Sequence, residues 1–502
     1  MKIMANLFAI AFLALFGCGA STDNDNQIEE IQVEPIYEQF DKKDGYEIKV
    51  KINNLKDTTI YLAFYLGDKT YMKDTTQLDA NGEGVFKADS SLPQGIYLVV
   101  LPRKTYFDVV VGENQHFSVE NDTAPADFIK NFKSTGSLEN QIFYGDILFI
   151  AERGKKREEI NKQIKDFEEK KKGNEVEKLK EELKKLDEEV RQNRKLLQAK
   201  YPGTLFSKLL KMMEEVPTPE SPKKENGELV DSNFAYNFYK QHYFDNYDFA
   251  DPRMLRTPIM HNKVINYLDK VCIQHYDTII EAVEYIIQKS KPDEESYKYW
   301  VITLLNKYAN TNIMGHEAVY VHIAEKYYSG DQAYWLDKAD KFRIMDRAAK
   351  MKPTLIDKQA PALVLKDVNG KMVNLYSIDA DYILLMFYDP DCGHCKKEAP
   401  LFKAAYDSLK TIYNIKAVAV SITNETDKWK KFLKEFGIED WYNLADLERV
   451  NPFREIYDIQ STPRLFLLDK DKFIRGKRFG PEQLSDLLKS LDRMKKQNKA
   501  GK

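Results

Sequence analysis

Two cysteines in the sequence Cys392-Gly393-His394-Cys395 constrain the fold of this chain more than any other feature. They follow the apolar run Tyr382–Tyr388, which is typical of a buried strand, and precede residues with the periodicity of an amphipathic helix. We therefore expect Cys392 at the N-terminus of that helix, where unpaired N–H groups and the helix dipole favour a thiolate. A cysteine pair at this spacing suits the transfer of two electrons through a reversible disulfide.

The elements predicted around this pair form a mixed α/β sheet. Their order is strand, helix, strand, helix, then a hairpin and a last helix. Two short strands that meet at an Asn369-Gly370 turn come before them. After the helix that carries the cysteines, we expect a strand at 415–422, a helix at 427–436, a hairpin across 469–471 and a helix at 482–494.

The segment 354–495 resembles the thioredoxin-fold proteins of the TlpA/ResA type. The motifs that carry the resemblance are Ala360-Pro361 with Gly370, the C-x-x-C-x-x-E-x-P stretch from Cys392 to Pro400, and Ser461-Thr462-Pro463 ahead of a predicted strand. The resemblance implies a thiol–disulfide oxidoreductase with no cofactor beyond its redox-active Cys392–Cys395 disulfide. It also implies a cis peptide bond before Pro463.

Each site residue has an expected role. Cys392 is the attacking thiolate, and Cys395 is the resolving thiol that releases a mixed disulfide. His394, as a cation or donor, would stabilise the Cys392 thiolate; the alternative is an exposed histidine without redox effect. By resemblance, Glu398 is a partly buried acid that handles the proton of Cys395; the alternative is a solvated carboxylate that complements the helix dipole.

The residues beside the pair add a substrate surface and an opposing charge. The resemblance places Thr462 and Pro463 next to the sulfurs, and we expect these two residues and Gly393 to contact the substrate. Asp391 stands where the family often has Trp, and its carboxylate would raise the pKa of Cys392, against the effect of His394.

The N-terminus predicts an exported lipoprotein. The apolar run from Leu7 to Phe16 is too short to span a bilayer and has the length of a signal-peptide core. Gly17-Cys18 resembles the bacterial lipobox, which implies removal of 1–17 and lipid on Cys18. An ordinary secretory signal with an incidental cysteine is the alternative. We expect a lipid-anchored protein of the cell envelope that faces the periplasm, with the outer membrane favoured.

The charge of the chain and its cysteine and histidine residues do not indicate a nucleic-acid partner or a metal site. The net charge of −3 becomes −3 − 1 = −4 when Lys2 leaves with the signal, which does not suggest a nucleic-acid partner. Cys272 reads as a small buried apolar side chain. His316 and His322 are six residues apart, whereas a helical zinc site needs two histidines four apart.

The whole chain is predicted to be multidomain, and its oligomeric state is left open. A polar tether at 18–40 leads to alternating strands at 41–125, which predict a small antiparallel β domain. Residues 131–352 predict an all-α domain with a charged helical hairpin that turns at Lys172-Gly173-Asn174; a dimeric coiled coil is the alternative. The aromatic stretch Tyr236–Phe249 is interpreted as helical core, with a recognition surface as the alternative. The α/β thioredoxin fold at 354–495 ends the chain.

These observations favour a membrane-anchored oxidoreductase that reduces or isomerises disulfides in exported proteins and draws on an envelope electron donor. An envelope binding or scaffold lipoprotein with an auxiliary redox domain is the alternative. A peroxidase of the same fold is disfavoured because Asp389 stands where that enzyme needs Thr. A zinc knuckle would need a second C-x-x-C pair.

Overall fold

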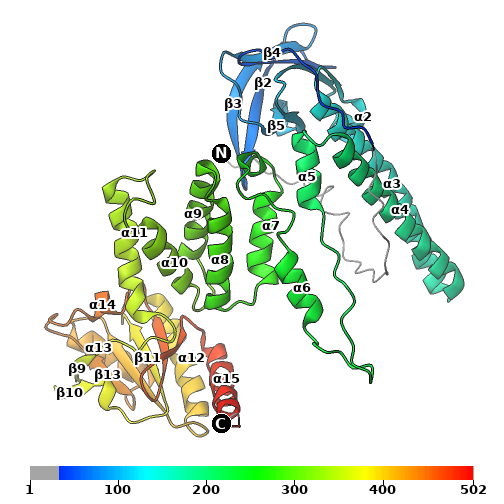
Figure 1. Cartoon of the computed structure of the whole chain (residues 1–502). Coiled ribbons are helices and arrows are strands. Elements are labelled where there is room, and N and C mark those ends of the chain that lie inside the picture. Colours follow the sequence, from blue (N-terminus) through cyan, green and yellow to red (C-terminus); the bar gives the residue numbers. More distant parts are fainter. Residues whose placement is uncertain (1–32, 501–502) are drawn as a thin grey trace. The chain divides into compact units, whose positions relative to one another are not determined.

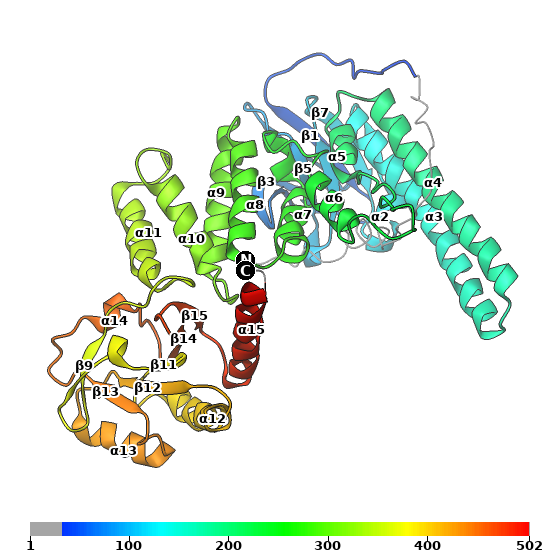
Figure 2. The same ribbon diagram turned by 60° about the horizontal axis from the view of Figure 1, so that its bottom comes forward.

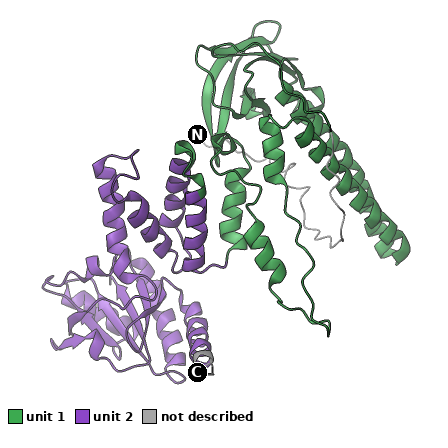
Figure 3. Ribbon diagram, viewed as in Figure 1, with its two compact units in different colours: residues 1–272, 289–296 green, residues 273–288, 297–502 purple. Residues whose placement is uncertain are grey.

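The computed structural model of the protein describes residues 33–500, with side chains as far as residue 496. The chain divides into two compact units, which Figure 3 shows in different colours and which are described separately here. The first unit contains residues 1–272 and 289–296, and the second contains residues 273–288 and 297–502. Cys18 and the predicted signal at 1–17 lie outside the described residues. Among the described residues, no helix combines the length and apolar character needed to cross a membrane.

The first unit begins with two four-stranded sheets. Alternating burial along the first strand directs Tyr46, Ile48, Val50 and Ile52 into one shared core, as the alternating sequence requires. One sheet has the order β4 (Glu83–Ala88), β1 (Tyr46–Ile52), β7 (His116–Asn121), β8 (Lys133–Thr135), and the other β3 (Lys69–Gln77), β2 (Thr59–Leu66), β5 (Gly95–Val100), β6 (Tyr106–Val111).

The β region departs from the sequence-based expectation in two details. The pair β1–β7 is parallel, while the other strand pairs of both sheets are antiparallel. Two parallel strands cannot be joined by a short hairpin and need a long connection. Between β1 and β7 this connection includes all four strands of the other sheet. The strand β8 also lies beyond residue 125, where we expected the β domain to end.

A long helical hairpin follows the sheets. Its arms α3 (Leu138–Glu169) and α4 (Gly173–Lys200) lie side by side in both views (Figures 1 and 2). Leu179 and Leu186 are buried along the seam, and Arg153 Nε lies 3.1 Å from Glu189 Oε2 across it. The apolar side chains of α4 are therefore buried against α3 of the same chain, without a second copy. The remaining helices of this unit include α2 (Phe128–Asn131), α5 (Leu205–Met213), α6 (Phe234–His242) and α7 (Met260–Asn266).

The second unit combines helices with the C-terminal α/β domain. The helices α8 (Tyr276–Ser290) and α9 (Glu294–Ala309) belong mostly to this unit, and α10 (Glu317–Ile323) and α11 (Lys338–Met351) belong to it entirely. The helical range 131–352 is therefore divided between the two units.

A seven-stranded sheet forms the centre of the C-terminal domain, which confirms the predicted mixed α/β thioredoxin fold. Its order is β10 (Met372–Asn374), β9 (Val364–Asp367), β13 (Tyr442–Ala445), β12 (Ile415–Ser421), β11 (Tyr382–Tyr388), β14 (Arg464–Asp469), β15 (Ile474–Lys477). The strand β11 is buried at every position because both of its faces are covered.

Each face of the central sheet has its own apolar core. One core joins Leu384, Met386 and Tyr388 to the helices α12 (Gly393–Leu409), α13 (Thr426–Phe436) and α15 (Pro481–Ala500). The other joins Ile383, Leu385 and Phe387 to residues before β11 and to α14 (Phe453–Ile456). The helix that carries the cysteines is thereby fixed to the middle of the sheet.

Candidate active site

The turn between β11 and α12 places both cysteines at a helix N-terminus. Asp389 shapes this turn: its carboxylate accepts from the Asp391 N–H at 2.9 Å, and its carbonyl accepts from the Cys392 N–H at 3.1 Å. Cys392 is the N-cap residue of α12, and Cys395 lies in the first turn. The first N–H groups of a helix have no partners within it, and those of His394 and Cys395 act on the Cys392 thiol.

The Cys392 thiol is half-buried and more acidic than an ordinary cysteine. Burial acts to raise its pKa, but hydrogen bonds to the sulfur outweigh burial and hold the pKa below its usual value. The groups that lower it are the Cys395 N–H, the Thr462 side chain, the Cys395 thiol and the His394 N–H.

The Cys395 thiol has the opposite character. It is buried, and burial raises its pKa to about 12. Both thiols are free in this structure, so it represents the reduced protein. Cys392 is therefore the more acidic of the two thiols, and Cys395 keeps its proton to a higher pH.

The strand β14 brings a distant segment to the sulfurs. Arg464 pairs with Phe387 across β11 and β14, so the residues just before Arg464 lie beside the turn that carries the cysteines. The Cys392 thiol donates to the Thr462 carbonyl at 3.4 Å, and the peptide bond between Thr462 and Pro463 is cis. The structure therefore brings Cys392, Cys395, Thr462 and Pro463 together.

The other expected site residues lie on the first turns of α12. His394 and Gly393 are exposed, and the contribution that His394 makes to the Cys392 pKa comes from its backbone N–H. Glu398 is half-buried, and its pKa is raised by burial and by the carboxylate of Glu482, while His394 lowers it. A carboxyl group in this setting can hold a proton at a higher pH than a solvated glutamate.

An ion pair beside Cys392 was not predicted from the sequence. Lys428 on α13 lies 2.8 Å from the carboxylate of Asp391, and it also pairs with Glu425 at 2.7 Å. The lysine lowers the pKa of Asp391 and offsets the negative charge next to Cys392. No motif marks Lys428, because it lies 37 residues from Asp391.

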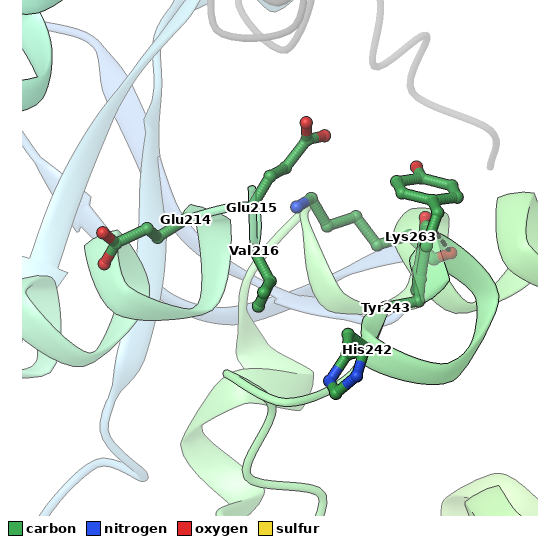
Figure 4. A pocket seen from close by; sticks show the side chains of 7 residues that line it. Glu214, Glu215, Val216, His242, Tyr243 and Lys263 are labelled. Carbon is green, nitrogen blue, oxygen red and sulfur yellow. Dashed lines mark hydrogen bonds between the residues drawn. The ribbon is translucent and has the colours of Figure 1, made fainter. Parts of the chain in front are cut away.

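The first unit contains a small pocket lined by residues between 214 and 263. Figure 4 shows its wall, which includes the amine of Lys263, whose pKa is lowered by burial. Tyr239, His242 and Tyr243 are the part of the aromatic stretch that lines it. Elsewhere in the stretch Phe244 and Phe249 are buried, whereas Tyr236 is exposed. The lining residues are Glu214, Glu215, Val216, Tyr239, His242, Tyr243 and Lys263.

The described residues offer no cluster suited to a metal. Between residues 33 and 500, no three His, Cys, Asp or Glu side chains are grouped to hold an ion. His322 instead contacts Glu284, with Nε2 2.7 Å from Oε1.

Three families match different parts of the chain. Residues 379–474 match a family described as thioredoxin-like. Residues 46–143 match a domain of unknown function (DUF4369), and residues 162–353 match another (DUF5106).

Two curated relatives are thiol-disulfide oxidoreductases named ResA. The protein of Bacillus subtilis (strain 168) is 29% identical over 112 residues, which cover 22% of this chain and 60% of that protein. The protein of Bacillus thuringiensis subsp. konkukian (strain 97-27) is 28% identical over 141 residues, 27% of this chain and 78% of that protein. The chain thus spans less than two thirds of the first relative.

Solved structures that are similar to parts of this chain include the following two. A domain of a possible thiol-disulfide isomerase from Cytophaga hutchinsonii ATCC 33406 is 35% identical, with 28% of this chain and 97% of that chain covered and a TM-score of 0.27. A thioredoxin-like protein from Bacteroides caccae ATCC 43185 is 22% identical, with 54% and 99% covered and a TM-score of 0.43. The family match at 379–474 and the observed sheet agree that the C-terminal domain has a thioredoxin-like fold, and its sequence is similar to that of the ResA thiol–disulfide oxidoreductases.

Proposed function

We propose that this protein is a membrane-anchored thiol–disulfide oxidoreductase of the cell envelope that reduces or isomerises disulfides in exported proteins. The observation that carries the proposal is the contrast between the two sulfurs. Cys392 is accessible and has a lowered pKa, whereas Cys395 is buried and its pKa is raised to about 12. This division suits one sulfur to attack and the other to resolve.

The reaction exchanges one disulfide for another. The Cys392 thiolate attacks a sulfur of the substrate disulfide, so that the substrate S–S bond breaks and a mixed disulfide forms. The first substrate sulfur leaves as a thiolate and takes up a proton. Cys395 then loses its proton and attacks Cys392, which releases the second substrate thiolate. The substrate gains two electrons, and the Cys392–Cys395 pair becomes a disulfide.

Two neighbouring groups support these steps in the proposal. Glu398 accepts the proton of Cys395, a role that suits a half-buried carboxyl group whose pKa is raised. His394 stabilises the Cys392 thiolate through its N–H, and the residue itself is exposed. A dithiol donor of the envelope returns the pair to the reduced state.

Insulin reduction driven by dithiothreitol tests the proposed activity. We expect the full chain to accelerate precipitation of the insulin B chain, and Cys392→Ser to abolish the acceleration because the other two thiols among the described residues are buried. The matched control is Cys272→Ser, which removes a buried thiol whose pKa is raised by burial and should leave the rate unchanged. Equal rates for wild type and Cys392→Ser would contradict the proposal.

The binding or scaffold alternative predicts a different outcome in a capture experiment. With Cys395→Ala, an exchange enzyme accumulates substrates as mixed disulfides on Cys392 that dithiothreitol releases. A scaffold retains the same partners when both cysteines are replaced. The pocket of Figure 4 is the feature of the first unit that a scaffold function could use.

A further inference from the structure

The segment that faces the sulfurs is held by one buried carboxylate. The loop at 457–463 joins α14 to β14 and ends at Thr462 and Pro463. In this loop Asp458 has a side chain with no exposed surface and a left-handed backbone, with φ of 50°. Its carboxylate accepts from Gln460 Nε2 at 3.0 Å, so it binds within its own loop.

Arg464 ties this carboxylate to the strand that follows Pro463. Its Nη2 lies 3.3 Å from Asp458 Oδ2 and 3.2 Å from the Asp458 carbonyl. Arg464 is itself buried at the first position of β14, opposite Phe387. The contacts from Asp458 to Arg464 thus close the loop around Thr462, whose carbonyl faces Cys392.

The remaining donor to Asp458 comes from the helical part of the second unit. Arg347 on α11 donates from Nη1 to Asp458 Oδ1 at 2.8 Å, across 111 residues of sequence. The Arg347 side chain is 34% exposed, while Asp458 is fully enclosed. A buried carboxylate that loses one of its charged donors is strongly destabilised in its position, because water cannot replace that donor.

We propose that Arg347 is a positioning residue for the redox site. It holds Asp458, and through Asp458 and Arg464 it sets the Thr462–Pro463 segment against Cys392. The helical part of this unit would thereby control how a protein substrate docks beside the sulfurs. This inference rests on the proposed oxidoreductase function and assigns a role to α11, which carries no redox group.

The test compares Arg347→Met with Arg343→Met in the full chain. Arg343 lies one turn earlier on α11, is 77% exposed and pairs with Asp340, so it controls for loss of an arginine from this helix. We expect Arg347→Met to lower kcat/KM for insulin about tenfold, within the roughly hundredfold that a 1 Å misplacement can cost. The loss should appear mainly in KM, and the pH at which Cys392 ionises should shift, because Thr462 is the residue of this loop that contacts its sulfur.

A merely structural role for Arg347 predicts another pattern. Partial unfolding would lower kcat in proportion to the lost active protein and leave both KM and the Cys392 titration unchanged. That pattern, wild-type behaviour, or an equal effect of Arg343→Met would overturn the proposal. Arg347→Lys should restore part of the loss, since a lysine can still donate one charged hydrogen bond to the carboxylate. If Arg347→Met does not fold, Arg347→Lys replaces it in the test, and we expect a smaller shift of the Cys392 titration with the same sign.

The two proposals fail in different ways. Absence of insulin reduction by the wild-type protein would contradict the oxidoreductase function. The ionisation of Cys392, followed by thiolate absorbance, still reports whether Arg347 positions Thr462. An unchanged titration in Arg347→Met then removes the positioning role alone.

Discussion

At the scale of single residues, the reactivity of Cys392 depends on a balance of charges within the first turn of α12. Asp391 places a carboxylate beside the sulfur, and that charge favours the thiol. Lys428 neutralises it from α13 through a 2.8 Å ion pair. The backbone N–H groups of the turn can therefore lower the pKa of Cys392 with little opposition from Asp391.

Replacing Lys428 should make Cys392 less reactive near neutral pH. We expect Lys428→Met to raise the pH of half-maximal alkylation by iodoacetamide, because the Asp391 charge is then unopposed. The Lys428–Asp391 ion pair is exposed, so the increase in this pH should be modest. It should become smaller as added salt screens the charges. Lys434→Met, which removes an exposed lysine from the same helix, should alkylate like wild type. A Cys392 that alkylates at the same or a lower pH in Lys428→Met would refute this role.

The residues of the site divide by how far apart they lie in sequence. Cys392, Cys395 and the Thr462-Pro463 pair could be predicted because each belongs to a short contiguous motif. Lys428, Arg347 and Asp458 could not, because their contacts cross 37 and 111 residues and exist only once the helices have packed. An ordinary lysine or arginine on a charged helix carries no local signal of such a contact.

At the scale of elements, periodicity predicted the long and regular segments. The apolar run of β11 and the seam of α4 both have patterns that one element alone explains. The strand β13 was missed because it spans only Tyr442–Ala445 and has no alternation: three successive residues are buried. The parallel pairing of β1 with β7 was missed because it depends on the path of the chain between them.

The attachment of α5 shows how a buried charge fixes an element. Glu139 near the start of α3 accepts from the N–H groups of Leu205 and Phe206 at 2.6 and 3.1 Å, at the N-terminus of α5. A carboxylate is favoured there by the helix dipole. Burial nevertheless dominates, and the pKa of Glu139 is raised from 4.5 to about 7.

This setting predicts that the docking of α5 weakens as the pH rises. The pKa of Glu139 is higher when α5 is docked than when it is detached, so the detached state loses its proton first. The docked state is therefore favoured below about pH 4.5 and loses stability as the pH rises through about 7. A pKa difference of this size corresponds to roughly 3 kcal/mol.

Hydrogen exchange of the α5 amides at pH 5 and pH 8 measures this effect. After correction for intrinsic exchange, protection of residues 205–213 should fall with pH in wild type. It should fall much less in Glu139→Gln, which cannot ionise. Glu159→Gln, which removes an exposed carboxylate from α3, should behave like wild type. Parallel pH profiles for wild type and Glu139→Gln would show that Glu139 does not govern α5.

At the scale of the whole molecule, the redox chemistry is confined to one unit. Of the three described cysteines, Cys272 is buried in the first unit with its pKa raised by burial, and the reactive pair lies in the second. The first unit supplies no further thiol among the described residues.

Lipid attachment at Cys18, a residue outside the described part of the chain, can also be tested. Lipid on both the sulfur and the amine of Cys18 would give stable attachment, because one acyl chain alone binds membranes only marginally. We expect the full chain, expressed in a Gram-negative host, to incorporate labelled palmitate and to partition into the Triton X-114 detergent phase. Cys18→Ser should abolish both, whereas Cys272→Ser should change neither. An unlabelled wild-type chain recovered from the aqueous phase would instead support an ordinary secretory signal, and the substrates would then meet a protein that is free in the periplasm.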